Sequence, residues 1–322
     1  DGANYIREMN NVISYLLDQD DIDLTLPEDL YPEENEEEEK NEEPKLKLKP
    51  KPKSKLKKEN PTELVAEENK YKGTRYTSLL HIACSRSIPQ IVRQLIPLTI
   101  SFYEQKEKKE NLFVHKNNSG NTVLNIACSE RDVDTIDVLI KYIRDPDNDI
   151  DFNDPMQFDI NTLSSSNLAP LHVICSIKET TKSLLILDDI LSIDSIDINL
   201  KSPETDQTAL HFACSSSNTK VVEKLIDYGS TVIDPNLFNN YDMTPLLIAV
   251  SRNAEGIVNC LLKLDTVDVN LAIPKIEKTP LYLACENSST RMAELLISDE
   301  RTDPNIPIAS NGNTPLHAAC EN

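Results

Sequence analysis

Glycine and tryptophan are the residues that this chain most clearly lacks: its 322 residues include 6 glycines and no tryptophan. No two glycines are adjacent, so the chain has no glycine-rich loop of the kind that cradles phosphate groups. No stretch approaches the roughly 18 to 20 uninterrupted apolar residues that a membrane-spanning helix needs. The first residues also lack the basic flank and apolar core of a signal peptide. We therefore expect a soluble protein located in the cytoplasm.

Positive charge is also in short supply. Lys and Arg number 33 against 54 Asp and Glu, which gives a formal net charge of −21. A field of this sign repels nucleic acid and anionic membrane surfaces. The imbalance persists in residues 71–322, where 22 basic and 34 acidic side chains leave a net charge of −12. We therefore expect protein partners with a basic or mixed-charge surface, and neither nucleic acid nor a membrane as a partner.

The seven cysteines include no CxxC pair, which argues against a zinc site or a redox motif. Six of them occupy the same place in one recurring phrase. A residue that recurs once per structural unit is expected to fill a small buried slot, where free Cys behaves as a small apolar residue. The spacing therefore favours a reduced, cytosolic setting over a disulfide framework.

The recurring phrase is present in seven copies, of which five start with threonine and five end in Ala-Cys. Intervals between successive phrase ends are 44, 47, 39, 36, 35 and 35 residues. A period of this size is typical of a solenoid built from stacked repeats. The seven phrases are Ser78–Cys84, Thr122–Cys128, Ala169–Cys175, Thr208–Cys214, Thr244–Val250, Thr279–Cys285 and Thr314–Cys320.

The phrase predicts the start of a helix. Its threonine is a helix N-cap, and the proline that often follows suits the first helical position. Leu, Ala and Cys then fall three to four residues apart on one stripe, where small side chains let a neighbouring helix approach closely. The structural residues that we expect to hold this motif are Thr122, Thr208, Thr244, Thr279, Thr314, His81, His172, His211 and His317.

A second apolar stripe follows each phrase after about eight to ten residues, as in Val221–Ile226. Each repeat is therefore a helix, a short turn and a second helix. A connector with Asp-x-Asn comes next, as in Asp197–Asn199. Asp and Asn bond their own backbone in turns, so the connector is expected to project as a hairpin-like finger.

Helix pairs of this period, opened by Thr-Pro-Leu-His, resemble ankyrin repeats over Tyr71–Asn322. The resemblance implies an all-α solenoid with projecting fingers, and a histidine that links neighbouring turns by a hydrogen bond. Asn125, Leu247 and Tyr282 replace that histidine. The resemblance also implies a left-handed glycine after each second helix, and only Gly229 clearly matches.

Three segments are expected along the chain. Residues 1–27 resemble the second helix and finger of another repeat, because apolar residues stand at helical spacing before Asp21–Leu24. Residues 28–70 are expected to be a disordered linker with segregated charge, acidic over Glu33–Glu43 and lysine-rich over Lys45–Lys58. Residues 71–322 are expected to hold seven ankyrin repeats, the last one truncated, so that the chain is a piece of something longer.

Candidate chemistry is weak. His and Cys stand three apart in four repeats, as in His81 and Cys84, which superficially offers a thiolate-imidazole pair or half a zinc site. A nucleophile is needed once, however, and a zinc site needs four converging ligands. The acidic loop Asp145–Asp151 lacks the glycine and the final Glu of a calcium loop. We expect no enzyme activity, no metal and no cofactor.

The function implied by the resemblance is protein binding, as a scaffold or adaptor and as a monomer. The alternative is a regulatory ankyrin region of a larger enzyme or channel whose working domain lies outside this chain. Candidate partner-binding aromatics lie at or just after the finger tips, although packing within a repeat is the competing interpretation: Tyr76, Phe238, Tyr241 and Tyr282. The run Lys45–Lys58 is open to three interpretations, a nuclear-import signal, a dock for an acidic partner, or an extended linker.

Overall fold

A computed structural model describes residues 25–26, 77–105, 113–117, 119–145, 158–229 and 231–321. The predicted linker at 28–70 and nearly all of the predicted partial repeat at 1–27 lie outside these residues. Tyr76 and the acidic loop from residue 146 onward lie outside them too.

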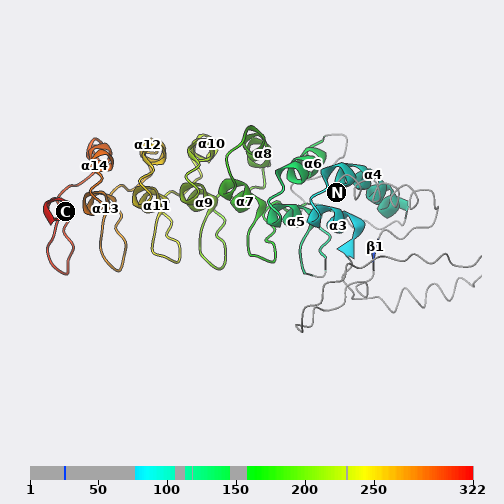
Figure 1. The fold of residues 1–322 in the computed structure, drawn as a ribbon, viewed down its shortest axis with the longest axis horizontal. Coiled ribbons are helices and arrows are strands. Elements are labelled where there is room, and N and C mark those ends of the chain that lie inside the picture. Colours follow the sequence, from blue (N-terminus) through cyan, green and yellow to red (C-terminus); the bar gives the residue numbers. More distant parts are fainter. Residues whose placement is uncertain are drawn as a thin grey trace, which may run out of the picture.

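Helices arranged in two parallel rows make up the array (Figure 1). Each repeat contributes a first helix to one row and a second helix to the other, and the fingers hang from the row of first helices. The first helices are α3 Leu79–Ser85, α5 Val123–Ser129, α7 Pro170–Ser176, α9 Ala209–Ser215, α11 Pro245–Ser251, α13 Pro280–Glu286 and α15 Pro315–Glu321. The second helices are α4 Pro89–Gln105, α6 Val133–Ile143, α8 Thr181–Leu191, α10 Thr219–Gly229, α12 Glu255–Leu262 and α14 Thr290–Ile297.

Every first helix is seven residues long, and from α3 to α11 its motif side chains are buried between neighbours, whereas those of the last helix, α15, are largely exposed. In α9, for example, Leu210, Ala213 and Cys214 are at most 1% exposed. Such small side chains let α9 pack directly against α7 and α11. The recurring phrase therefore specifies the closeness of the repeats as well as the start of each helix.

Apolar stripes on the second helices complete one continuous core along the array. Val222 and Leu225 of α10 are fully buried, and α10 packs between α8 and α12. Ion pairs join adjacent second helices on their outer surface, such as Lys224 with Asp188 at 2.5 Å. Exposed pairs of this kind contribute about 0 to 1 kcal/mol each, so burial provides most of the cohesion.

In five of the six described helix pairs the turn contains one residue with positive φ, the pair α7 and α8 being the exception, and none of these five residues is glycine. They are Ser87, Arg131, Ser217, Asn253 and Ser288. Gly229 has no positive φ, so the expected left-handed role at the end of the second helix is wrong for it. A Cβ at Gly229 would stand 2.7 Å from Ile198 Cδ1, so close packing explains this glycine.

One short strand pair departs from the helical pattern. β1 Thr25–Leu26 lies antiparallel to β2 Thr77–Ser78, with Leu26 opposite Thr77 and Thr25 opposite Ser78. Apart from this pair the described fold is the all-α solenoid that the sequence predicts. Within the described part of the chain, no helix combines the length and the apolar character needed to span a membrane.

Candidate interaction surface

Each described finger is closed by one backbone hydrogen bond between its two arms. The N–H group of the descending arm donates to the carbonyl of the ascending arm at 2.8 to 3.1 Å. The residue before the ascending arm always has positive φ, so all six tips turn in the same way. The bonded pairs are Asn117–Asn121, Ser164–Leu168, Ser202–Gln207, Asn239–Met243, Ile273–Lys278 and Ile308–Asn313.

Neighbouring tips are also joined to one another. Asn240 donates its backbone N–H to the carbonyl of Thr205 at 2.9 Å, and its Nδ2 to the carbonyl of Glu204 at 2.6 Å. Lys275 Nζ lies 2.7 Å from Asp242 Oδ2 on the adjacent finger. Equivalent ties join the other tips: Asn121 with Ser165, Asn167 with Glu204, and Ala309 with Glu277. The tips therefore form one braced surface, which we call the finger-tip surface.

An asparagine ladder runs along the base of the fingers. Asn199 donates from Nδ2 to the carbonyl of Val232 at 2.8 Å and accepts from the backbone N–H of Asp234 at 2.9 Å. The aspartate of the same connector accepts from the asparagine backbone, as Asp197 does from Asn199 at 3.0 Å. Asn161, Asn236 and Asn270 make the same two bonds to the next repeat. The connector is thus an inter-repeat link as well as a turn.

The motif histidines tie first helices to the following finger. The Nε2 atom of His172 lies 2.8 Å from the carbonyl of Leu200, and that of His211 lies 3.1 Å from the carbonyl of Met243. His81 makes the corresponding contact with the carbonyl of His115 at 3.3 Å. A carbonyl only accepts, so Nε2 carries a proton, and in His172 and His211 the other ring nitrogen, Nδ1, accepts a backbone N–H, so these two rings are neutral. Burial lowers the pKa of His81 and of His211 to about 4, and lowers that of His172.

Helix starts use two alternative caps. Where the histidine is replaced, the threonine hydroxyl accepts the N–H of the third helical residue at 3.2 Å: Thr122 from Asn125, Thr244 from Leu247, and Thr279 from Tyr282. Where the histidine is present, its Nδ1 accepts the backbone N–H of the cap residue at 3.1 Å: His172 from Ala169, His211 from Thr208, and His317 from Thr314. The hydroxyls of Thr208 and Thr314 then lie 2.9 Å from that Nδ1.

The candidate aromatic residues differ in how exposed their side chains are. Tyr241 sits at a finger tip and is 66% exposed. Phe238 is half-buried and packs against the core. Tyr282 takes the place of the motif histidine in α13, where it is 5% exposed and packs with Ile308 and Ala318. Burial of Tyr282 therefore favours the competing interpretation, packing within the array, over partner binding, because the side chain faces the next repeat.

Ile276 is a surface residue that the sequence did not single out. It is 46% exposed and occupies, on the next finger, the position that Tyr241 occupies on its own. The two fingers are the ones joined by the ion pair between Lys275 and Asp242. An isoleucine between Lys275 and Glu277, at the centre of a polar tip, is the signal that could have revealed it. Tyr241 and Ile276 are thus exposed at equivalent positions of adjacent finger tips, and we refer to these two side chains together as the apolar spot.

The buried cysteines of α3, α5, α7 and α9 hold their protons. Burial raises the pKa of Cys128 to about 12 and raises those of Cys84, Cys175 and Cys214 well above the usual value. A thiol is a nucleophile or a metal ligand only as the thiolate. Among the described residues, no group of three or more His, Cys, Asp or Glu side chains is placed to hold a metal ion.

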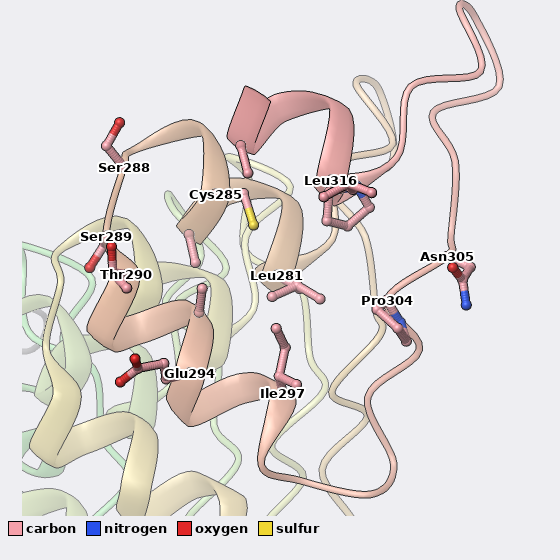
Figure 2. A pocket seen from close by; sticks show the side chains of 14 residues that line it. Leu281, Cys285, Ser288, Ser289, Thr290, Glu294, Ile297, Pro304, Asn305 and Leu316 are labelled. Atoms are coloured by element: carbon pink, nitrogen blue, oxygen red, sulfur yellow. The ribbon is translucent and has the colours of Figure 1, made fainter. Parts of the chain in front are cut away.

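A pocket of about 620 Å³ lies at the end of the array, between α13, α14 and α15 (Figure 2). Its lining is apolar, with Leu281, Ile297 and Leu316, and Glu294 is its one charged residue. One repeat earlier, α14 packs against α12 and α13, which is the corresponding place in the stack. The pocket is therefore a helix-packing groove, and it lacks the converging polar groups of a small-molecule site.

Comparisons with known proteins agree with the repeat structure described above. A family model described as ankyrin repeats (3 copies) matches residues 171–273 and 267–322. The repeat array of this chain is an ankyrin-repeat domain. Ankyrin repeats generally serve as protein–protein interaction modules.

Relatives and solved structures show the same repeats. The chain is 23% identical over 217 residues to an ankyrin repeat protein of Acanthamoeba polyphaga mimivirus, an alignment that covers 64% of this chain and 27% of the relative. The chain thus spans about a quarter of that relative's length. The ankyrin repeat domain of Bcl-3, a member of the IkappaB protein family, has a TM-score of 0.57 at 20% identity, covering 76% of this chain and 94% of that one. An ankyrin repeat domain from Acinetobacter baumannii AYE has a TM-score of 0.51 at 22% identity, covering 68% and 96%. At these identities the two structures show the fold alone.

Proposed function

We propose that this ankyrin-repeat domain acts as a non-catalytic scaffold or adaptor, and that it binds its protein partner on the finger-tip surface. The observation that carries the proposal is the braced row of tips with Tyr241 and Ile276 exposed on adjacent fingers. Exposed aromatic and large apolar side chains supply most of the binding energy in protein interfaces. Tips that are already bonded to each other lose little conformational freedom when a partner binds.

The charge of the tips supports a partner with a basic segment. The described lysines of the central fingers are engaged within the domain: Lys275 pairs with Asp242, Lys278 pairs with Glu286, and Lys201 donates to the carbonyl of Phe238. Glu204 and Asp206 lie on the same surface without a described lysine or arginine partner. A surface of this sign speeds association with a basic partner and makes the rate depend on salt.

The proposed role needs no chemistry from the cysteines and histidines. Their neutral, buried forms stabilise the repeats, and this supports a non-catalytic function. Buried free thiols also suit the reducing cytoplasm, where we place this role.

The test compares the full chain with two double variants. Tyr241→Ala/Ile276→Ser removes the apolar spot on the tips, and Leu185→Ser/Tyr228→Ala removes exposed apolar side chains from α8 and α10 in the other row. Each protein is immobilised and offered a cell lysate at low and high salt, and the retained proteins are quantified by mass spectrometry. We expect a set of proteins that both the wild type and the α8/α10 variant retain. The tip variant should retain at least about tenfold less of these proteins, and high salt should release them.

The binding isotherm of the strongest such protein then gives the affinity directly. Equal retention by the wild type and the tip variant would show that the finger tips do not bind it. Selective loss in the α8/α10 variant would place the interface on the second helices instead.

A further inference from the structure

The pairing of β1 with β2 matches the hydrogen-bonded arms of the fingers residue for residue. In five fingers the descending arm reaches its bonded residue five positions after the connector aspartate, as from Asp197 to Ser202. Leu26 likewise stands five positions after Asp21. The register on the descending side is therefore the register of a finger.

The ascending side agrees independently. In every described finger the bonded residue of the ascending arm stands four positions before the motif histidine or its replacement, as Gln207 does before His211. Thr77, which lies opposite Leu26, stands four positions before His81. Figure 1 shows β2 at the start of α3, with β1 beside it on the side of the array where the fingers hang.

The lengths between the two arms differ greatly. The described fingers have three or four residues between their bonded arms. Between Leu26 and Thr77 there are 50 residues, which include the acidic stretch Glu33–Glu43 and the lysine-rich stretch Lys45–Lys58. Loop closure depends only weakly on loop length, so a finger tip tolerates an insertion of this size.

We infer that residues 27–76 are an insertion in the tip of a further finger, and that they do not link two separate domains. The chain up to Leu26 then belongs to the same array as α3, and the finger-tip surface extends by one finger beyond the six described ones. The insertion leaves the array on the finger side, so a partner that lies across the tips meets its charged stretches. This last consequence rests on the proposed function, whereas the placement of the insertion does not.

Cross-linking tests the placement without any partner. In the full chain carrying Cys320→Ser, which removes an exposed thiol, one variant has Thr25→Cys/Ser78→Cys and another has Leu26→Cys/Thr77→Cys. Residues directly opposite on antiparallel strands are within disulfide reach. We expect mild oxidation to link at least one of these pairs in most molecules, as seen by peptide mapping. A control pair, Leu26→Cys/Ser119→Cys, joins two different fingers and should remain reduced. Linkage of neither opposite pair above the control would overturn the inference.

Shortening the insertion gives a second readout. We replace residues 27–76 by Pro-Glu-Thr-Asp, which are the residues between the bonded arms Ser202 and Gln207. If 27–76 is a finger-tip insertion, the shortened chain should keep the helical circular dichroism signal of the described helices. Its Tm should equal that of the full chain or exceed it by a few degrees. Removal of residues 1–76 altogether should instead lower Tm, because it takes away an arm of the array. A shortened chain that loses helicity, or a truncation that leaves Tm unchanged, would contradict the inference. Failure to find a binding partner would leave both results intact and would count only against the proposed function.

Discussion

The structure predicts that its buried neutral histidines make the folded protein less stable as the pH falls. His211 is fully buried, its Nε2 donates to the carbonyl of Met243, and its Nδ1 accepts from the backbone N–H of Thr208. Burial lowers its pKa to about 4, and Lys201 contributes in the same direction. The substitution His211→Leu removes the titrating group. Leucine already fills this position at Leu247, so the backbone accepts it.

The direction of this pH effect follows from the linkage between proton binding and folding. The unfolded chain, with a histidine pKa near 6.5, takes up a proton before the folded chain does as the pH falls. The contribution of His211 is therefore complete above about pH 6.5 and is lost as the pH falls towards 4. Between pH 7 and pH 5 this loss amounts to about 2 kcal/mol for one histidine with these two pKa values. His81, whose folded pKa is also about 4, adds a loss of similar size.

The assay measures the free energy of unfolding in urea at pH 7 and at pH 5 for the wild type and for His211→Leu. Carboxylates titrate alike in both proteins, so the difference between the two pH dependences isolates His211. At pH 7 the variant should be less stable by about 1 kcal/mol, since it loses the bond to the Met243 carbonyl. Between pH 7 and pH 5 it should lose about 2 kcal/mol less than the wild type.

The control is His317→Leu, which changes the exposed histidine of α15. This variant reports the effect of the same histidine-to-leucine exchange away from the buried site. The reasoning would be refuted by a His211→Leu protein that loses as much stability as the wild type between pH 7 and pH 5, because His211 would then titrate equally in both states.

Three further substitutions test the packing and the caps by urea unfolding at pH 7. Asn199→Ala removes two inter-repeat bonds of the ladder and should lower the free energy of unfolding by about 2 kcal/mol. Asn305→Ala, at the end of the described ladder, should lower it by well under 1 kcal/mol. Equal losses in the two variants would contradict the inter-repeat role. Gly229→Ala should lower the free energy of unfolding by about 1 to 3 kcal/mol, because the added Cβ would overlap a neighbouring isoleucine. Gly256→Ala should lower it by less, because its Cβ would meet only a threonine side chain at 3.2 Å. A larger loss for Gly256→Ala than for Gly229→Ala would count against close packing at Gly229. Thr279→Ala should cost about 1 kcal/mol through loss of the cap, and an unchanged midpoint would show that the hydroxyl does not cap α13.

The sequence predicts the helix pairs well because their cause is local. A threonine before an apolar stripe starts five of the seven first helices, and the interval between phrases fixes the repeat. The asparagine ladder could not be predicted in the same way. Asn199 bonds a carbonyl 33 residues away, and the sequence shows only its local neighbours, for which a turn is a sufficient explanation.

Exposure of the aromatic side chains shows the same limit. Tyr241 and Tyr282 both follow finger tips in the sequence, yet one is exposed and the other is buried. The difference is the helix start: Tyr282 is the third residue of α13 and takes the histidine position, which faces the next repeat. Alignment of the phrases places Tyr282 at that position, so its burial could have been anticipated. An isoleucine between Lys275 and Glu277 could have drawn attention to this tip, but how far its side chain is exposed is known only from the structure.

Three kinds of bond join neighbouring repeats: asparagine to the connector, tip to tip and, where the motif histidine is present, histidine to the finger carbonyl. The tip-to-tip bonds lie among the fingers and the histidine bonds start from the first helices, whereas the second helices are joined mainly by apolar packing and exposed ion pairs. Directional bonds fix the relative positions of neighbouring fingers more tightly than apolar packing, which is not directional. The bonds involve backbone groups and recurring polar residues, so the remaining tip side chains are free to vary without loss of the fold. A binding surface with fixed spacing and variable side chains is the arrangement that a protein-recognition module needs.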